Sequence, residues 1–154
     1  MSKTLLVVAH TPSPNTERVL QAILAGAGHP DIAGVSVVHR AALQATADDI
    51  RGCDGIILFT TENLGYMSGA LKDFFDRCYY PVLEEKQGLP CAVVIRAGHD
   101  GTGTRRALDT ILTGLRWRQV VEAVVLRGEW QEGFPDRAGE VGMTMAAGLE
   151  AGIF

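Results

Sequence analysis

Five short apolar runs, separated by segments of helical periodicity, constrain the fold of this chain more than any other feature. The runs cover residues 5–9, 35–38, 55–60, 91–95 and 120–126. Parallel strands need long crossover connections, and helices supply them with a preferred right-handed sense. The pattern therefore predicts an α/β domain with one five-stranded parallel sheet and helices on both of its faces.

The segments between the runs carry apolar residues at helical spacing. A stripe through Val19, Leu20, Ile23, Leu24 and Ala27 predicts the first helix. We expect further helices over 47–52 and 68–79, around the stripe of 108–115, and in the closing segment 141–153. The polar Glu122 interrupts the last apolar run, which we predict as a single fifth strand.

Length and charge fit one domain that spans residues 1–154. The formal net charge is −4 and no lysine or arginine cluster occurs, which disfavours nucleic acid and anionic membranes as partners. No apolar stretch approaches the roughly 20 residues that span a bilayer, and the N-terminal run is too short for a secretory signal. We expect a soluble cytoplasmic protein.

The three cysteines, Cys53, Cys78 and Cys91, show neither C-x-x-C spacing nor a nearby histidine pattern. An odd number of this kind argues against a disulfide framework and against a metal site. We interpret them as packing residues.

Three loops are expected at the carboxyl ends of the strands, where open parallel sheets bind their ligands. The first covers residues 10–16, just after the first apolar run. A helix N-terminus binds anions through its unpaired backbone N–H groups. Such groups are expected at Ser13, Asn15, Thr16 and Glu17, whereas Pro12 and Pro14 have none. The candidate phosphate ligands are Thr11, Ser13, Asn15 and Thr16. Helix capping by Ser13 or Asn15 is the alternative.

The second loop, residues 60–68, is unusually apolar for a turn. Tyr66 can offer a ring face to a flat ligand, and Gly65 and Gly69 allow close backbone approach. The alternative is that Leu64, Tyr66 and Met67 cover the end of the core or contact another subunit. The candidate binding residues here are Thr61, Glu62, Asn63, Leu64, Gly65, Tyr66 and Met67.

The third loop, residues 96–104, places Gly98, Gly101 and Gly103 in a G-x-x-G-x-G pattern. This spacing is the reverse of the dinucleotide motif, so it is weak support for a pyrophosphate site. We interpret it as a loop that a ligand approaches closely, with an ordinary flexible turn as the alternative. His99 and Asp100 complete the candidate set.

Together these residues resemble the flavodoxin-like superfamily, and within it the NAD(P)H-dependent FMN reductases and the quinone reductases related to the tryptophan-repressor-binding protein. The resemblance spans nearly the whole chain. It is carried by the loop 10–16, by the glycine loop after the fourth strand and, most specifically, by the segment 65–77, with its small-residue helix start, Leu71-Lys72 and the ending Phe75-Asp76-Arg77.

The resemblance implies a sheet of order 2-1-3-4-5 that binds FMN, with the phosphate at residues 11–16 and the isoalloxazine ring between the second and third loops. It also implies NAD(P)H as electron donor and a quinone or similar small molecule as acceptor. The flavin carries this chemistry, so no catalytic side chain is nominated. His99 and Asp100 are candidates for proton donation or relay near the ring, or are simply solvated.

The sequence departs from the family pattern at two places. Pro14 stands where the family's phosphate loops usually carry glycine, which removes one donor. Glu62-Asn63 replaces a proline and an aromatic residue, and a carboxylate that points inward at Glu62 would repel reduced flavin. Two other functions stay open: a flavodoxin-type electron carrier, and a binding module without FMN.

Two further expectations concern surface residues. Arg96, Arg105 and Arg106 lie close to the expected site, where an arginine can engage a 2′-phosphate or be merely solvated. Relatives in the family form dimers or tetramers, so a homodimer or homotetramer is expected. The candidate interface residues, which alternatively cap the core edges, are Tyr79, Tyr80, Pro81, Trp117 and Trp130.

Overall fold

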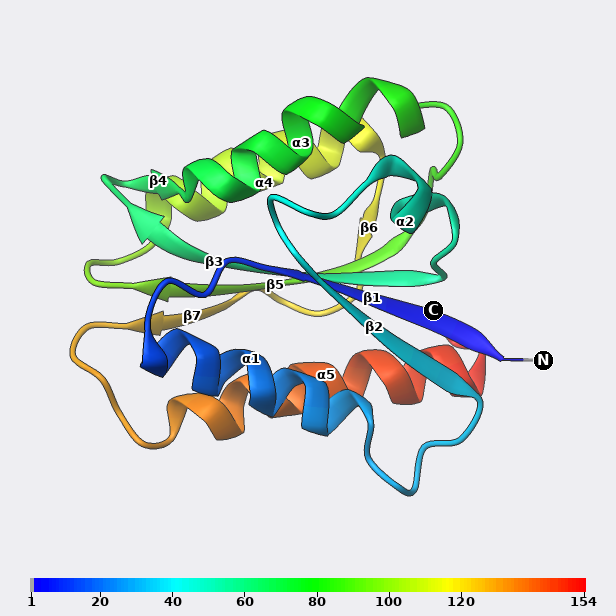
Figure 1. Cartoon of the computed structure of the whole chain (residues 1–154), viewed down its shortest axis with the longest axis horizontal. Coiled ribbons are helices and arrows are strands. Elements are labelled where there is room, and N and C mark those ends of the chain that lie inside the picture. Colours follow the sequence, from blue (N-terminus) through cyan, green and yellow to red (C-terminus); the bar gives the residue numbers. More distant parts are fainter. Residues whose placement is uncertain (1) are drawn as a thin grey trace.

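A central parallel sheet lies between two helical layers in the computed structural model, which describes residues 2–154 (Figure 1). The strands are β1 (Lys3–Ala9), β2 (Val35–Ala41), β3 (Gly55–Asn63), β4 (Tyr66–Met67), β5 (Pro90–Ala97), β6 (Arg118–Gln119) and β7 (Val124–Arg127). The helices are α1 (Pro14–Ala27), α2 (Ala47–Arg51), α3 (Gly69–Val82), α4 (Thr102–Leu115) and α5 (Phe134–Ala151).

The strand order is β2-β1-β3-β5-β6, and β7 also pairs with β5. The predicted parallel order is therefore confirmed, with one correction: the fifth strand is split. β6 pairs with the start of β5 and β7 with its end, and residues 120–123 between them belong to neither strand, although the Val120 N–H still donates to the carbonyl of Cys91. The polar Glu122 lies in this break, so the interruption that the sequence showed marks the end of one pairing segment and the start of another.

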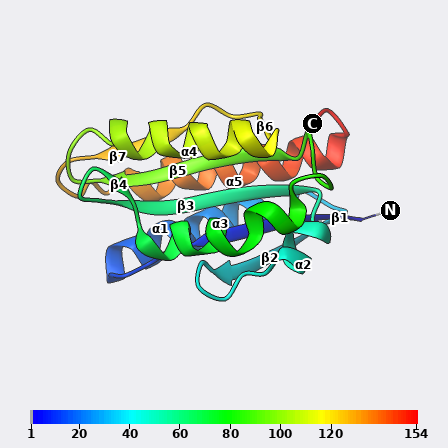
Figure 2. The ribbon, with the colours of Figure 1, turned by 90° about the horizontal axis from the view of Figure 1, so that it is seen from above.

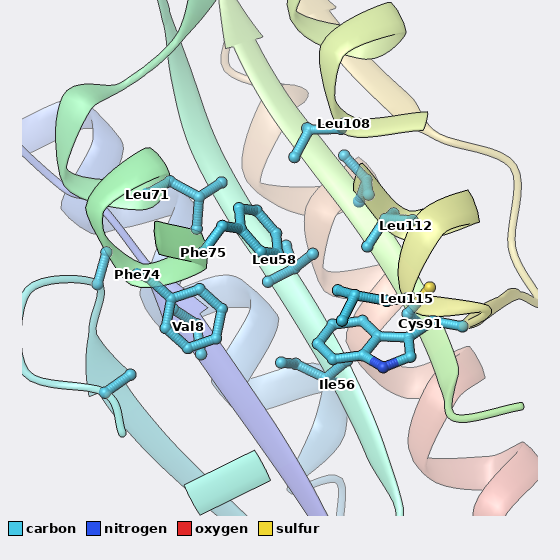
Figure 3. Close-up of a cluster of buried hydrophobic side chains, with 14 of the residues drawn as sticks. Val8, Ile56, Leu58, Leu71, Phe74, Phe75, Cys91, Leu108, Leu112 and Leu115 are labelled. Atoms are coloured by element: carbon cyan, nitrogen blue, oxygen red, sulfur yellow. The ribbon is translucent and has the colours of Figure 1, made fainter. Parts of the chain in front are cut away.

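Side chains from alternate strand positions fill two cores, one on each face of the sheet. On one face, α1 and α5 cover a cluster that includes Val7, Phe59 and Val94. On the other, α3 and α4 run side by side over the sheet (Figure 2). Their side chains point down onto the central strands in Figure 3, where the labelled residues are Val8, Ile56, Leu58, Leu71, Phe74, Phe75, Cys91, Leu108, Leu112 and Leu115.

The contact between α1 and α5 is unusually close because glycines line it. A Cβ on Gly26 would lie 2.0 Å from the carbonyl oxygen of Gly139, and one on Gly142 would lie 2.2 Å from that of Ile23. Real Cβ atoms do not approach backbone oxygens this closely, so only glycine permits the packing. The backbones of α1 and α5 are therefore in direct contact at these glycines.

Several element boundaries differ from the prediction. β3 continues to Asn63 and pairs antiparallel with β4, so most of the expected second loop is a β-hairpin. β5 continues through Ala97, and α5 begins at Phe134, about two turns before its predicted stripe, which starts at residue 141. The irregular part of the third loop shrinks to residues 98–101.

All three cysteines are free and buried, which confirms their interpretation as packing residues. Among residues 2–154, no group of histidine, cysteine and carboxylate side chains is arranged to hold a metal ion. Over the same residues, no helix combines the length and the apolar character needed to cross a bilayer.

Candidate functional site

The three predicted ligand loops lie at the carboxyl edge of the sheet (Figure 1, left). The chain leaves β1 toward β2 on one side and returns to β3 on the other, so the strand order reverses beside β1. The backbone N–H of His10 donates to the carbonyl of Phe59, which ties the first loop to β3. This reversal point is where open α/β sheets bind ligands.

The first loop is organised as a helix cap. Ser13 is the N-cap of α1: its Oγ accepts a hydrogen bond from the N–H of Thr16, at 3.2 Å. In return, Thr16 Oγ1 accepts from the N–H of Ser13 at 3.0 Å. The Glu17 N–H donates to the carbonyl of Ser13 within the first turn. The capping alternative is thus confirmed for Ser13.

This cap leaves fewer free backbone N–H groups to donate to an anion. Of the four N–H groups expected to be available, those of Ser13, Thr16 and Glu17 donate within the loop or helix. The N–H of Asn15 is the one among them with no protein acceptor in the described residues. The polar side chains of Thr11, Ser13 and Asn15 are at least partly exposed beside it, whereas Thr16 is buried. A phosphate bound here would rely on side chains as much as on the backbone.

Glu17 adds negative charge beside the same loop. Hydrogen bonds from the Gln21 amide and the Thr11 hydroxyl, together with the nearby His39, hold the pKa of the Glu17 carboxyl below its usual range. Burial lowers the pKa of His10 and of His39, although the charge of Glu17 opposes the shift at His39. Both histidines therefore favour the neutral form, and the first loop gains little positive charge from them.

The second loop forms a hairpin whose two-residue turn is Leu64-Gly65. Both residues have positive φ, 54° and 76°. This is the backbone of the type I′ turn that suits the twist of a hairpin. Leu64 is fully exposed at the tip and Tyr66 is 39% exposed, whereas Met67 is buried in the core. Leu64 and Tyr66 thus present an apolar surface beside the site, and the core-covering alternative holds for Met67.

The base of the hairpin is fixed by a small polar network. The Ser68 N–H donates to Thr60 Oγ1 at 3.0 Å, and Ser68 Oγ accepts from the N–H of Leu71 at 3.1 Å, which caps α3. Thr60 and Ser68 are fully buried. Neighbouring Thr61 donates to the side-chain oxygen of Asn63 at 2.8 Å. Sequence reasoning missed the Thr60–Ser68 pair, because their separation of eight residues has meaning only once the hairpin is known.

Glu62 joins the hairpin to the third loop. One carboxylate oxygen accepts from the N–H of His99 at 2.9 Å, and the other accepts from the N–H of Gly101 at 2.8 Å. The sequence marks Glu62 as a departure from the family pattern but does not predict a partner for its carboxylate. In the structure this carboxylate accepts hydrogen bonds from the backbone of the third loop.

The third loop is a compact turn into α4. Gly101 has φ of 70°, and a Cβ there would lie 2.7 Å from the Val125 side chain. Asp100 Oδ1 accepts from the N–H of Thr102 at 3.0 Å, and this bond lowers the pKa of the Asp100 carboxyl. His99 is exposed. The conformation requires glycine at 101, whereas Gly98 has open space around it.

A cleft of about 260 Å³ lies next to the first loop, between the ends of β1 and β2 and the start of α3. It shares Thr11 with the predicted site. No sequence pattern indicated its other walls, because the segment after β2 is separated from the first loop by the whole of α1. The lining residues are Ala9, His10, Thr11, Ala41, Ala42, Leu43, Gln44 and Ala70.

The three candidate arginines have different surroundings in the structure. Arg96 packs its guanidinium 5.0 Å over the ring of Phe134 and donates to the carbonyls of Ala97 and Leu126. Burial lowers its pKa. Arg105 lies 3.8 Å from Glu122, and Arg106 is exposed.

The candidate interface aromatics also separate. Trp117 is buried in the core, which matches the core-capping alternative, and Tyr79 and Trp130 are half-buried. Tyr80 is exposed, as is Pro81. The homodimer or homotetramer stays a prediction, with these two residues as its exposed candidate contacts.

The chemistry of the edge suits the expected FMN. Hydroxyl and amide groups at the start of α1 provide uncharged donors for a phosphate. A Cβ at Gly69 or Gly98 would meet no atom within 4 Å, so the backbone is open to a flat ring at the start of α3 and at the start of the third loop. The exposed face of Tyr66 supplies apolar surface nearby.

Comparison with known proteins agrees with this geometry. A family model described as NADPH-dependent FMN reductase matches residues 9–132, most of the chain. A flavodoxin of Aquifex aeolicus (strain VF5) is 28% identical over 111 residues, which are 72% of this chain and 59% of that relative's length. The chain therefore spans less than two thirds of that relative.

Solved structures share the fold across nearly the whole chain. A flavodoxin, WrbA-like protein from Agrobacterium tumefaciens superposes with a TM-score of 0.75 at 18% identity, covering 98% of this chain and 99% of that one. A flavodoxin from the domain Archaea gives a TM-score of 0.77 at 16% identity, covering 96% and 99%. At these identities the likeness establishes the flavodoxin-like fold. Together with the family match, it shows that this chain belongs to the NADPH-dependent FMN reductase family.

Proposed function

We propose that this protein is an FMN-dependent oxidoreductase that takes electrons from NAD(P)H and delivers them to a quinone or a similar small acceptor. The observation that carries the proposal is the meeting of three segments at the reversal point of the sheet: the start of α1, the β3–β4 hairpin and the loop before α4. The family match supports the choice of cofactor and donor.

The first loop is assigned to the phosphate. Ser13 and Asn15 would donate through their side chains, and Asn15 also through its N–H. Thr11 would donate once its hydroxyl turns from Glu17 to the phosphate. Thr16 contributes indirectly, because its hydroxyl holds the N–H of Ser13 and so fixes the loop. The α1 dipole favours an anion at this end, whereas Glu17 opposes it.

The hairpin and the third loop are assigned to the ring. Thr61, Asn63 and Tyr66 would border the ring from the hairpin, and Gly98, His99, Asp100 and Gly101 would border it from the third loop. Gly65 and Gly103 pack against each other and join the two segments. Bound FMN would supply the redox chemistry by accepting a hydride and passing electrons on. The residues of the chain bind and orient the reactants, and the side chain of His99 is exposed beside the site.

An FMN titration tests this function. Purified protein is titrated with FMN and, in parallel, with riboflavin, followed by visible absorbance and flavin fluorescence, and NADPH is then added without oxygen. We expect FMN to bind more tightly than riboflavin and NADPH to bleach the bound flavin. Failure to bind FMN at tens of micromolar, which means a binding free energy weaker than about −6 kcal/mol, would contradict the proposal.

A flavodoxin-type electron carrier is the second candidate, because the matched relative from Aquifex aeolicus is named a flavodoxin. The same experiment separates the two functions. A carrier would bind FMN yet be reduced only slowly by NADPH, whereas a reductase would turn over with NADPH and a soluble quinone.

A further inference from the structure

Glu62 has an unusual position for an acidic residue beside a flavin site. Its two oxygens accept N–H groups from the same short loop, at 2.9 Å from His99 and 2.8 Å from Gly101. Hydrogen bonds to a carboxylate are about twice as strong as those between neutral groups. The loop forms a small concave anion site of the kind made by successive backbone N–H groups. The anion in it is a side chain of the protein.

The loop is held from its other sides as well. Asp100 accepts from the N–H of Thr102, and its own carbonyl accepts from Arg127 Nε at 3.1 Å. The N-terminus of α4, which favours negative charge, begins directly after this turn. The positive φ of Gly101 turns the chain into α4 directly after the N–H that donates to the carboxylate. The Glu62 bonds therefore tie the loop to the hairpin, and the Arg127 bond ties it to β7.

The hairpin reaches the loop at a second point. Gly103 in the first turn of α4 packs against the backbone of Gly65, with no room between them for a Cβ. Glu62 near the base and Gly65 at the tip thus attach the same hairpin to the same turn. The relative position of the two walls of the ring site depends on these contacts.

We propose that Glu62 is a positioning residue that holds the loop 98–101 in its binding shape before FMN arrives, and whose charge makes bound FMN harder to reduce. This proposal rests on the proposed function. The N–H groups of His99 and Gly101 are taken by Glu62, so they do not serve as donors to the cofactor. The carboxylate that takes them adds negative charge to the ring site, where reduction adds electron density.

The first part is tested on the protein without FMN. In Glu62→Gln, an amide NH₂ replaces one acceptor, so one N–H group loses its partner and the other keeps a neutral acceptor in place of a charged one. We expect NMR-resolved hydrogen exchange at His99 and Gly101 to quicken by about tenfold or more, the effect of losing a charged hydrogen bond. The matched control is Glu84→Gln, which removes an exposed carboxylate at the far end of α3. It should leave both amides unchanged.

The second part uses the FMN-loaded protein. We expect Glu62→Gln to bind FMN more weakly than the wild type and to raise its two-electron midpoint potential; a tenfold shift in preference toward reduced flavin equals about 30 mV. Glu62→Asp keeps the charge on a shorter side chain. It should loosen the amides while leaving the potential near that of the wild type, and it keeps the test available if Glu62→Gln folds poorly.

The outcomes separate the two proposals. Unchanged exchange at His99 and Gly101 in Glu62→Gln would overturn the positioning role. A potential that does not rise, or that rises equally in Glu84→Gln, would overturn the effect of charge. If exchange quickens but the wild type binds no FMN, the proposed function fails and the role of Glu62 in a flavin site fails with it, leaving only a structural contact.

Discussion

Gly103 of α4 lies directly against Gly65 of the hairpin turn, so that a Cβ on Gly103 would sit 2.1 Å from the Gly65 carbonyl oxygen. Gly103→Ala should therefore push the hairpin away from α4. We expect it to lower the free energy of unfolding by about 1–3 kcal/mol, as overpacking does, and to weaken FMN binding. Urea unfolding and an FMN titration measure the two effects. Gly133→Ala, whose Cβ would meet nothing within 4 Å, is the control and should change neither.

Leu64 occupies a left-handed position that leucine rarely adopts, at φ of 54°, with its side chain fully exposed. Leu64→Asn places a residue there that tolerates this backbone and is common in type I′ turns. We expect the free energy of unfolding to rise by about 1 kcal/mol, because the strain is relieved and no buried contact is lost. Urea unfolding measures it. A destabilised variant would mean that Leu64 makes a stabilising contact.

Ser13 and Asn15 can be separated by their roles in the first loop. Ser13→Ala removes the N-cap acceptor of the Thr16 N–H and should lower the free energy of unfolding by about 1 kcal/mol. Asn15→Ala removes a donor outside this cap, so it should weaken FMN binding with little effect on unfolding. Comparison of FMN with riboflavin isolates the phosphate, because riboflavin lacks it. Equal losses for both flavins in Asn15→Ala would contradict a phosphate contact.

Pro14→Gly restores the N–H that proline lacks at the start of α1. We expect tighter FMN binding and unchanged riboflavin binding. The same change gives the unfolded chain more freedom, so stability should fall by about 1 kcal/mol. Isothermal titration and urea unfolding would show this opposite movement of affinity and stability. An unchanged FMN affinity would mean that the missing donor does not limit phosphate binding.

The buried thiols make stability fall at alkaline pH. Burial raises the pKa of Cys53 to about 11 and that of Cys91 to about 12. Thiols of the unfolded chain have a pKa of about 8.5. Each pKa unit between the folded and unfolded states corresponds to about 1.4 kcal/mol of stability once both forms are ionised. Above that pH the unfolded chain has lost protons that the native state keeps, so unfolding becomes easier as pH rises toward 11.

Urea unfolding at pH 8 and pH 10 tests this effect with Cys91→Ala as comparison. Both proteins share the other titrating groups, and the cavity left by alanine is the same at both pH values. We expect the wild type to lose more stability between the two pH values than the variant does. Equal losses would show that Cys91 does not contribute.

The sequence predicted the layers and strand order because apolar runs and helical stripes are local patterns. It placed β1, α1 and α3 well, and Ser13 emerged correctly as a possible cap. It did not predict the hairpin, because Leu64-Gly65 is an atypical turn pair for a tight hairpin. It also treated residues 120–126 as one strand, whereas pairing with two separate parts of β5 divides them.

The sequence predicted which loops form the candidate site, but it did not predict the contacts between them. That the loops at 10–16, around 62 and around 100 share one edge follows from parallel topology alone. The bonds from His99 and Gly101 to Glu62 join residues 37 and 39 positions apart. No periodic pattern encodes such a pairing, because it depends on the exact length of β3 and on the turn before α4. The sequence likewise could not show that the N–H groups of Ser13 and Thr16 are used in the cap of α1.

The close seating of α1 against α5 has a mechanical consequence. With backbone against backbone at Gly26 and Gly142, α1 cannot slide or roll without a clash. The first loop therefore precedes a helix that is held in place by α5. The other side of the site is a two-stranded hairpin, which the Glu62 hydrogen bonds and the Gly65–Gly103 contact attach to its neighbours. We therefore expect any movement that widens the site to occur on the side of the hairpin, while the start of α1 stays in place.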